Sequence, residues 1–437
     1  MSTERKLFGT DGVRGEAGTF LSAELALSLG RAAAASLEAA RPQVLIIRDT
    51  RESGPMLEAA LAAGVAEAGG DALLGGVLPT PAAAILIRRL GLDLAAVVSA
   101  SHNPYKDNGI KFFSGNGTKL GDEAEAEIEA LLEAGPKPAN AGHVRELNGG
   151  EEDYLRALEA AFPLDLSGIK VALDCANGAT HRVAPAIFQR LGAEVEAIAT
   201  EPDGRNINDG CGSTHLGNLA AHVAGSEATV GFAFDGDGDR VLAVDGSGRT
   251  HDGDELIALL ARGQAKRGDL GGGVAVTVMS NFGFHSAMED DGIEVAVTKV
   301  GDRYVLDELR ERGWALGGEQ SGHIIDMRFA ATGDGIAAAL MTMRELGERD
   351  LASVEAMEKL PQKLVNVEVA EREAIAGAAT VWEAVEREAA ELEGRGRVLL
   401  RPSGTEPLVR VMVEAPSTDE ADAVCKRLAD LVRQELG

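Results

Sequence analysis

Residues 99–111 combine a hydroxyl, an imidazole and an ammonium group in one short polar segment. The apolar residues 94–98 lead directly into it, which is typical of a buried strand that delivers a loop to the edge of a sheet. Ser101 supplies the hydroxyl, His102 the imidazole and Lys111 the ammonium group. A serine near cations suits phosphoryl transfer, because the cations offset the phosphate charge. A lone serine more often only caps a turn, so this segment needs support from elsewhere in the chain.

Residues 235–240 read Asp-Gly-Asp-Gly-Asp-Arg and hold three carboxylates within five positions. In an extended or gently curled loop, positions i, i+2 and i+4 share one side. Three carboxylates this close need a cation between them, and ligands that are all oxygen select Mg²⁺ or Ca²⁺. We expect a divalent-metal site at Asp235, Asp237 and Asp239, with Arg240 suited to a phosphate beside the metal. An EF-hand would need glycine where Arg240 stands, whereas an acidic turn without a metal stays open as an alternative.

Three further polar segments could contact a phosphorylated sugar. Residues 318–323 (Gly-Glu-Gln-Ser-Gly-His) offer hydrogen-bond acceptors for sugar hydroxyls and a proton carrier. Residues 401–407 (Arg-Pro-Ser-Gly-Thr-Glu-Pro), followed by Arg410, could form a nest of backbone N–H groups for an anion, with guanidinium groups beside it. Residues 10–15 place Arg14 near the start of the chain. Each segment taken alone also fits an ordinary polar turn.

Apolar runs alternate with Ala-rich segments of helical period along most of the chain, which predicts an α/β fold. The predicted strands are 44–47, 72–74, 171–173, 229–234, 274–278 and 295–297, and the predicted helices include 56–68, 179–191 and 302–312. Three short strands (95–98, 230–234 and 314–316) each run into a polar loop, which suggests three similar units around a shared cleft. Boundaries are expected at the Gly- and Pro-rich residues 135–150, near 246–249 and near 360–362.

The composition excludes several classes of protein. A length of 437 residues exceeds one hydrophobic core and predicts two to four domains. A net charge of −28 argues against nucleic acid and against anionic membranes as partners. The chain has no apolar run of bilayer length, no signal-peptide core and only three well-separated cysteines, so we expect a cytoplasmic protein. It also lacks the Gly-x-Ser-x-Gly elbow of many hydrolases and the phosphate-binding loop of nucleotide-driven kinases.

Five motifs, in this order, resemble those of the α-D-phosphohexomutase superfamily. They are residues 8–15, 99–104, 235–240, 318–323 and 401–407. Within the superfamily, the opening motif, residues 211–215 and Gln320 are similar to the phosphoglucosamine mutase branch. Phosphomannomutases and phosphoglucomutases usually carry methionine at the position of Gln320.

The resemblance implies three similar α/β domains with mixed sheets and a small C-terminal α+β domain, similar to the TATA-binding-protein fold, around a central cleft. The expected limits are 1–149 for the phosphoserine loop, 150–248 for the metal loop, 249–362 for the sugar loop and 363–437 for the phosphate loop. It also implies a homodimer and a small phosphosugar as substrate.

The resemblance further implies that Ser101 becomes a phosphoserine and that glucosamine 6-phosphate and glucosamine 1-phosphate interconvert through a 1,6-bisphosphate. One Mg²⁺ per chain would be held by Asp235, Asp237, Asp239 and a phosphoryl oxygen on Ser101, and glucosamine or glucose 1,6-bisphosphate would serve as activator. The other implied roles are contact with the reacting phosphoryl (Arg14, Lys111, Arg240), proton transfer (Lys111 or His323, then His102), sugar binding (Glu319, Ser321) and binding of the second phosphate (Arg401, Ser403, Gly404, Thr405, Arg410).

Three alternatives remain at this point. A phosphomannomutase or phosphoglucomutase of the same superfamily would share the motifs and differ in substrate. A sugar-phosphate phosphatase would use Ser101 or metal-bound water and release inorganic phosphate. A metal-binding module without catalytic activity would need only the carboxylate loop and would leave the other four motifs unexplained.

Overall fold

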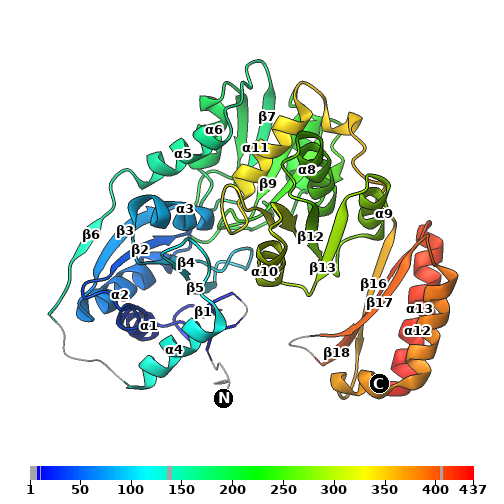
Figure 1. Ribbon diagram of the computed structural model, residues 1–437, viewed down its shortest axis with the longest axis horizontal. Coiled ribbons are helices and arrows are strands. Elements are labelled where there is room, and N and C mark those ends of the chain that lie inside the picture. Colours follow the sequence, from blue (N-terminus) through cyan, green and yellow to red (C-terminus); the bar gives the residue numbers. More distant parts are fainter. Residues whose placement is uncertain (1–6, 10, 135–139, 404–406) are drawn as a thin grey trace. The chain divides into compact units, whose positions relative to one another are not determined.

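The computed structural model describes residues 7–9, 11–134, 140–403 and 407–437 (Figure 1). The chain divides into two compact units. The first comprises Met1–Met279 and Ile293–Glu355, and the second comprises Ser280–Gly292 and Ala356–Gly437. The first unit contains three α/β domains and the second an α+β domain, in agreement with the predicted fold class.

The first domain is built on a six-stranded mixed sheet. In spatial order the strands are β1 (Val13–Glu16), β5 (Asp107–Ser114), β4 (Leu94–Val98), β2 (Gln43–Arg48), β3 (Asp71–Val77) and β6 (Val144–Glu146). Strands β4, β2, β3 and β6 run parallel, whereas β5 and β1 are antiparallel to their neighbours. One face packs against α1 (Ala23–Ala35), α2 (Gly54–Glu67) and α4 (Asp122–Ala134), while α3 (Thr80–Leu90) packs against β2 and β4. Strand β4 is buried along its whole length and lies inside the sheet. The serine loop (residues 99–106) begins at its C-terminal end.

The second domain has a five-stranded mixed sheet. Its strands, in spatial order, are β11 (Thr250–His251), β10 (Val241–Asp245), β9 (Val230–Phe234), β7 (Lys170–Asp174) and β8 (Glu194–Ile198). Helices α6 (Val183–Arg190) and α7 (Gly217–Ala224) pack against this sheet, and α5 (Gly150–Ala161) packs against α3 and α6. The carboxylate loop (residues 235–240) connects β9 to the antiparallel β10. The tight reversal of the chain between these two strands fixes the position of the loop.

The third domain has four strands, in the order β13 (Glu294–Thr298), β12 (Gly273–Thr277), β14 (Leu316–Gly318) and β15 (Ile324–Asp326). Its helices are α8 (Gly253–Arg267), α10 (Asp302–Arg312) and α11 (Gly335–Leu346). Helix α8 begins at a capping box formed by Asp252 and Glu255 and ends at Gly268 in the left-handed conformation. Helices α8 and α11 also pack against β10, which joins the second and third domains.

The second unit is an antiparallel sheet with helices. The strand order is β16 (Gln362–Glu368), β18 (Leu408–Glu414) and β17 (Arg397–Pro402), and the helices are α12 (Ala379–Glu391), α13 (Thr418–Leu436) and α9 (Phe282–Asp290). Helix α9 comes from a distant part of the sequence. The backbone N–H of Phe282 donates to Glu414 Oε2 at 2.7 Å, and Asn281 Oδ1 accepts from the N–H of Leu360 at 3.0 Å.

Several elements differ from the predictions in detail. Lys111 lies inside strand β5 rather than in the loop after β4, because the chain returns to the sheet at Asp107. Strand β14 begins at Leu316 rather than at residue 314. The predicted linker at 135–150 contains the edge strand β6 and the start of α5.

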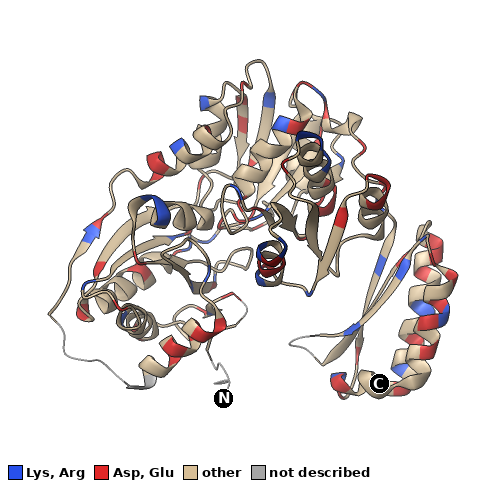
Figure 2. Ribbon diagram, in the orientation of Figure 1, with Lys and Arg blue, Asp and Glu red and all other residues tan. Residues whose placement is uncertain are grey.

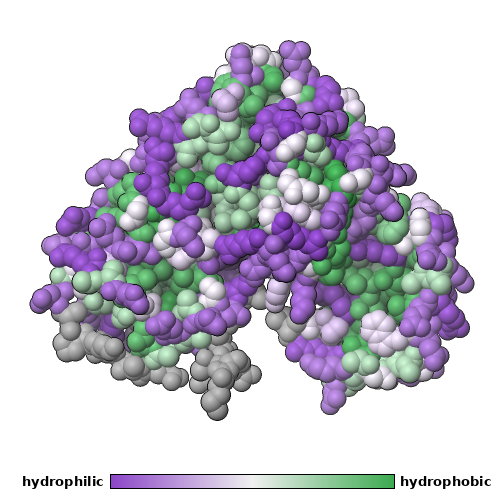
Figure 3. Space-filling model, in the orientation of Figure 1, coloured by the Kyte–Doolittle hydropathy of each residue, from purple (hydrophilic) through white to green (hydrophobic). Residues whose placement is uncertain are grey.

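The surface agrees with the composition. Acidic residues gather on α4 (Figure 2), and the face shown in Figure 3 is largely hydrophilic. Within the described residues, no helix is both long and apolar enough to cross a membrane.

Candidate active site

Ser101 is buried at the C-terminal end of β4, in a backbone conformation that side-chain-bearing residues rarely adopt (φ 51°). Its Oγ donates to Asp235 Oδ2 at 2.5 Å, so the predicted serine loop and the predicted metal loop meet. His102 Nδ1 lies 3.3 Å from the same Oγ. Uncommon backbone conformations of this kind cluster at functional sites, and here one directs a hydroxyl at a carboxylate cluster.

A fully buried guanidinium, that of Arg51, holds the serine loop in place. Its two terminal nitrogens donate to four backbone carbonyls of the loop and its end, those of Ser101, Asn103, Pro104 and Asp107, at 2.5–2.9 Å. Its Nε donates to Asp49 Oδ2 at 2.8 Å. All five N–H groups of one side chain are therefore used, and four of them fix the backbone around the serine.

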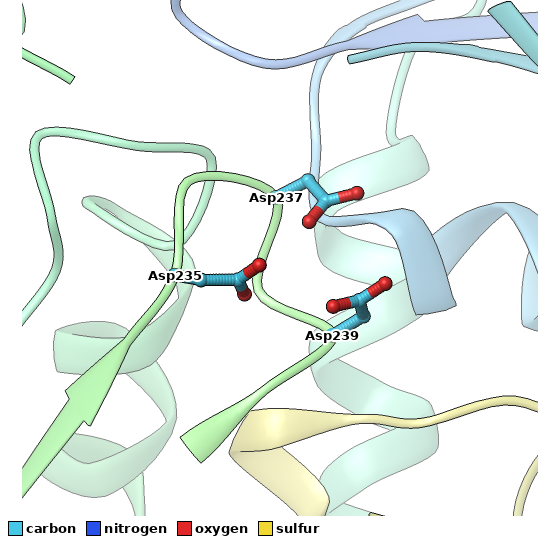
Figure 4. A group of neighbouring side chains, drawn as sticks. All are labelled: Asp235, Asp237 and Asp239. Atoms are coloured by element: carbon cyan, nitrogen blue, oxygen red, sulfur yellow. The ribbon is translucent and has the colours of Figure 1, made fainter. Parts of the chain in front are cut away.

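The carboxylates of Asp235, Asp237 and Asp239 surround a common space (Figure 4). One oxygen from each lies within 4.8 Å of the other two. Among the described residues, Asp237 Oδ1 and Asp239 Oδ1 are buried and have no hydrogen-bond partner. Burial and the neighbouring charges of Asp239 and Asp237 raise the pKa of Asp235 well above its usual range. A buried set of oxygen donors with unsatisfied lone pairs fits a hard divalent cation such as Mg²⁺.

Lys111 brings an ammonium group to the carboxylate loop from β5. Its Nζ lies 2.7 Å from Asp237 Oδ2 and 3.5 Å from Asp239 Oδ2. Burial works against the charge on Lys111, but Asp11, Asp237 and Asp239 outweigh it and raise its pKa. The opposite holds for His102, where burial and the nearby Arg240 and Arg14 lower the pKa to about 4.

Two arginines border the same loops. The side chain of Arg14, on β1, pairs with Asp11, and the backbone N–H of Arg240 donates to Asp235 Oδ1 at 3.1 Å. The Nε atoms of Arg14 and Arg240 are both buried and have no hydrogen-bond partner among the described residues. Guanidinium N–H groups left free in this way are suited to phosphate oxygens.

The predicted sugar loop lies beside the carboxylate loop, because the N–H of Val241 donates to the carbonyl of Gly322 at 3.0 Å. Glu319 Oε1 accepts from the N–H of Gly301 at 3.0 Å, and Ser321 is exposed. His323 is buried. Its Nε2 accepts from the N–H of Gly333 at 3.0 Å, so a neutral ring carries its proton on Nδ1, which lies 3.7 Å from Asp239 Oδ1.

A cavity of about 550 Å³ lies next to this cluster, between residues 114–124 of the first domain and the start of α10. His323, Lys119 and Asp302 are part of its wall. The cavity therefore adjoins the cluster of carboxylates on the side of His323.

The predicted phosphate loop belongs to the second unit. Arg401 on β17 and Arg410 on β18 stand directly opposite each other in the antiparallel pair. Burial and the guanidinium of Arg410 lower the pKa of Arg401. Ser403 is buried, and its N–H donates to the carbonyl of Leu408 at 2.8 Å. Like charges directly opposite each other destabilise a sheet, and an anion bound between the two guanidinium groups would offset their repulsion. Gly404 and Thr405 of the predicted loop lie outside the described residues.

Comparison with known families agrees with this arrangement. Profiles of the four domains of phosphoglucomutase/phosphomannomutase match residues 5–138 (alpha/beta/alpha domain I), 152–248 (domain II), 252–364 (domain III) and 364–431 (C-terminal domain). The chain belongs to this phosphohexomutase family.

Phosphoglucosamine mutases are among the relatives that match this phosphohexomutase along nearly its whole length. The phosphoglucosamine mutase of Streptomyces avermitilis is 50% identical over 452 residues, covering 99% of this chain and 100% of the relative. That of Pelotomaculum thermopropionicum is 50% identical over 442 residues, covering 98% and 99%. A solved phosphoglucomutase/phosphomannomutase family protein from Burkholderia thailandensis superimposes with a TM-score of 0.83 at 25% identity, covering 98% of this chain and 97% of that one.

Three features of the phosphohexomutase site are missing from the predictions. Arg51 is one. Asn208 is the second, since its Nδ2 donates to the carbonyl of Ser101 at 3.0 Å. The third is the close approach at Gly236, where a Cβ would lie 2.6 Å from the same carbonyl. Asn208 falls in the polar segment before residues 211–215, whose composition was the available signal, but nothing in the sequence showed that it reaches the serine loop.

Gln320, which the sequence associates with substrate choice, has a defined partner within the protein. Its Nε2 donates to Asp254 Oδ2 at 3.2 Å, in the first turn of α8. Residues 211–215 also bind to the protein itself. The N–H of Gly212 donates to Asp174 Oδ2, and the N–H of Ser213 donates to the carbonyl of Phe234, directly before the carboxylate loop. Both segments therefore shape the loops of this phosphohexomutase.

Proposed function

We propose that this phosphohexomutase interconverts glucosamine 6-phosphate and glucosamine 1-phosphate, with Ser101 as the phosphoryl carrier. The observation that carries the proposal is the 2.5 Å contact between Ser101 Oγ and Asp235, inside a cluster of carboxylates, arginines and a lysine. The names of three similar relatives that match nearly the whole chain, all phosphoglucosamine mutases, support the choice of substrate.

The reaction consists of two transfers that use one serine. Phosphorylated Ser101 gives its phosphoryl group to O1 of glucosamine 6-phosphate: the Ser Oγ–P bond breaks, an O1–P bond forms, and the O1 hydroxyl proton passes to a base of the protein while Ser101 Oγ takes up a proton. The resulting 1,6-bisphosphate turns around, and its 6-phosphoryl group passes to Ser101, leaving glucosamine 1-phosphate and restoring the phosphoserine. Activation of an unphosphorylated chain would need a trace of glucosamine or glucose 1,6-bisphosphate.

Charge neutralisation is the main task of the site. Asp235, Asp237 and Asp239, with a phosphoryl oxygen on Ser101, would hold one Mg²⁺ per chain. When bound, Mg²⁺ would offset the negative charge on the transferred group. The buried, unpartnered Nε atoms of Arg14 and Arg240 would contact the phosphoryl oxygens from the protein side.

Proton transfer falls to one of three candidates. Lys111 and His323 border the carboxylate loop, and His102 Nδ1 lies 3.3 Å from Ser101 Oγ. Glu319 and Ser321 would bind the sugar ring, which must be accepted in two orientations.

The second phosphate would be bound in the C-terminal unit, where the facing pair Arg401 and Arg410 supports an anion site. Ser403, Gly404 and Thr405 complete the proposed loop. The proposed domain limits remain 1–149, 150–248, 249–362 and 363–437, and the matched family segments support them. Three free cysteines support the proposed cytoplasmic location, and a homodimer is proposed from the family alone.

The test is kcat/KM for the 1-phosphates of glucosamine, glucose and mannose, measured with Mg²⁺ and a trace of bisphosphate. We expect the highest kcat/KM for glucosamine 1-phosphate. A higher kcat/KM for mannose 1-phosphate or glucose 1-phosphate would reassign the substrate. Ser101→Ala should abolish turnover, whereas Ser36→Ala, at the end of α1, should retain it. Steady release of inorganic phosphate in place of isomerised product would identify a phosphatase and overturn the proposal.

A further inference from the structure

Six charged or ionisable side chains form a closed ring next to Ser101, with acidic and basic groups in alternation. In order around the ring they are Asp239, Lys111, Asp11, Lys119, Asp302 and His323. The first domain contributes three members, the second domain one and the third domain two, all within the first compact unit. The ring therefore joins three domains at one point beside the carboxylate loop.

The inner half of the ring consists of Asp239, Lys111 and His323 and lies at the carboxylate loop. Lys111 Nζ lies 3.5 Å from Asp239 Oδ2, and His323 Nδ1 lies 3.7 Å from Asp239 Oδ1. The side chains of these three residues are only 3–5% exposed. Asp239 thus stands between a lysine and a histidine that are both candidates for proton transfer.

The outer half is formed by Asp11, Lys119 and Asp302, whose side chains are 14–24% exposed. Lys119 Nζ is shared, because it lies 2.5 Å from Asp11 Oδ1 and also pairs with Asp302 Oδ2. None of the three is assigned a role in the proposed reaction.

Each outer carboxylate also reaches one inner group. Asp11 Oδ2 lies 4.0 Å from Lys111 Nζ, and Asp302 Oδ2 lies 3.7 Å from His323 Nε2. Lys111 therefore has carboxylates on two sides, and His323 lies at equal distances from Asp302 and Asp239. Attraction between opposite charges is strong in a site shielded from water, so the balance between the two sides sets where Lys111 stands.

Lys119 controls this balance. Its ammonium group neutralises Asp11 and Asp302 together, which leaves Lys111 free to stand at Asp237 and Asp239. Without that ammonium group, Asp11 would attract Lys111 away from the carboxylate loop.

We propose that Asp11, Lys119 and Asp302 are positioning residues that keep Lys111 against the carboxylate loop. The inference rests on the proposed phosphoryl transfer at Ser101. It predicts that the charge of Lys119, rather than its packing, decides the rate of turnover.

The experiment compares Lys119→Met and Lys119→Arg in the full-length chain, with Mg²⁺, glucosamine 1-phosphate and a trace of glucose 1,6-bisphosphate. Lys119→Met should lower kcat about a hundredfold, the scale expected for a displacement of about 1 Å at a reacting centre. KM should change less than about threefold, since the outer half of the ring is not a substrate contact in the proposal. Lys119→Arg should return kcat to within about tenfold of wild type, because it restores the charge and the adjoining cavity has room for the longer side chain.

Lys170 offers a matched control, because it also lies near two carboxylates, Glu194 and Glu227, but at the protein surface. Lys170→Met should leave kcat unchanged. A crystal structure of Lys119→Met gives a readout independent of activity, in which Lys111 Nζ should lie closer to Asp11 than to Asp237.

Two results would overturn the inference: a folded Lys119→Met with kcat within about threefold of wild type, or an unmoved Lys111 in its crystal structure. If Lys119→Met does not fold, Lys119→Gln takes its place. It removes the same charge and should likewise move Lys111 Nζ towards Asp11 and lower kcat with little change in KM, and an unmoved Lys111 would overturn the inference. An inactive wild-type enzyme would instead refute the proposed function, while the crystallographic readout would still test the ring.

Discussion

Arg51 offers the most direct test of how the serine loop is built, through the substitution Arg51→Met. Methionine is of similar length but donates no hydrogen bonds. The substitution leaves the buried carboxylate of Asp49 without its cation, and it leaves four carbonyls around Ser101 without the N–H groups that they now accept from.

The magnitude follows from the burial of both partners, whose side chains are 0% exposed. Removing one member of a buried ion pair costs about 3–5 kcal/mol. Burial already raises the pKa of Asp49, against the effect of Arg51, so this carboxyl can take up a proton and keep the cost near the lower end. For a domain of this size, the cost corresponds to a fall of about 6–20 °C in the unfolding temperature. Turnover should fall about a hundredfold as the serine loop relaxes.

The assay is differential scanning calorimetry of the whole chain, which resolves domains that unfold separately, combined with turnover of glucosamine 1-phosphate. Arg48→Met is the matched control, because Arg48 pairs with Glu58 at 3.0 Å at a partly exposed position, where a pair contributes about 0–1 kcal/mol. If the two variants unfold within about 2 °C of each other, or if Arg51→Met retains full turnover, Arg51 does not hold the loop as described.

Three other perturbations have defined outcomes. His251 lies 3.0 Å from Asp245 and 3.1 Å from Glu255. These carboxylates raise the pKa of His251 although burial opposes the charge. The protonated histidine therefore stabilises the folded state below about pH 6.5, and this stabilisation is lost as the pH rises through the raised pKa. His251→Gln should therefore lower the unfolding temperature more at about pH 6 than at about pH 9, and equal effects would contradict this. Gly236→Ala should lower kcat about a hundredfold, because its Cβ would lie 2.6 Å from the carbonyl of Ser101, whereas Gly217→Ala, with open space around it, should behave as wild type. Asp237→Asn should raise the Mg²⁺ concentration for half-maximal activity more than about tenfold, and an unchanged requirement would exclude this residue as a ligand.

The sequence predicted the parts of the site that are local. Asp235, Asp237 and Asp239 come from one short loop, so their spacing alone brings their carboxylates together. The order of strands and helices followed from apolar periodicity, and α10 has the predicted limits. Placing Lys111 in a loop was wrong, because a run of polar residues does not show where the chain rejoins the sheet.

The parts that depend on long-range contacts could not be predicted. Lys119 and Asp302 are 183 residues apart, and Ser101 and Asp235 are 134 apart. Arg51 follows a strand in a polar segment and reads there as a surface residue, since nothing local shows that four carbonyls will converge on it. The order of strands in the sheets, with β5 inserted between β1 and β4, likewise depends on pairing between distant segments.

The position of helix α9 affects how this chain can be divided. The polypeptide passes between the two compact units three times, near residues 280, 292 and 356. A fragment that begins at residue 356 would lack α9, and the buried carboxylate of Glu414 would lose the N–H of Phe282 as a donor. A single proteolytic cut after Glu355 would separate residues 356–437 covalently from the rest of the chain, but they would stay associated through non-covalent contacts with α9, which remains part of the first fragment. The C-terminal module therefore cannot be expressed or exchanged as one continuous segment, and a chimera with a relative would have to carry residues 280–292 from the same parent.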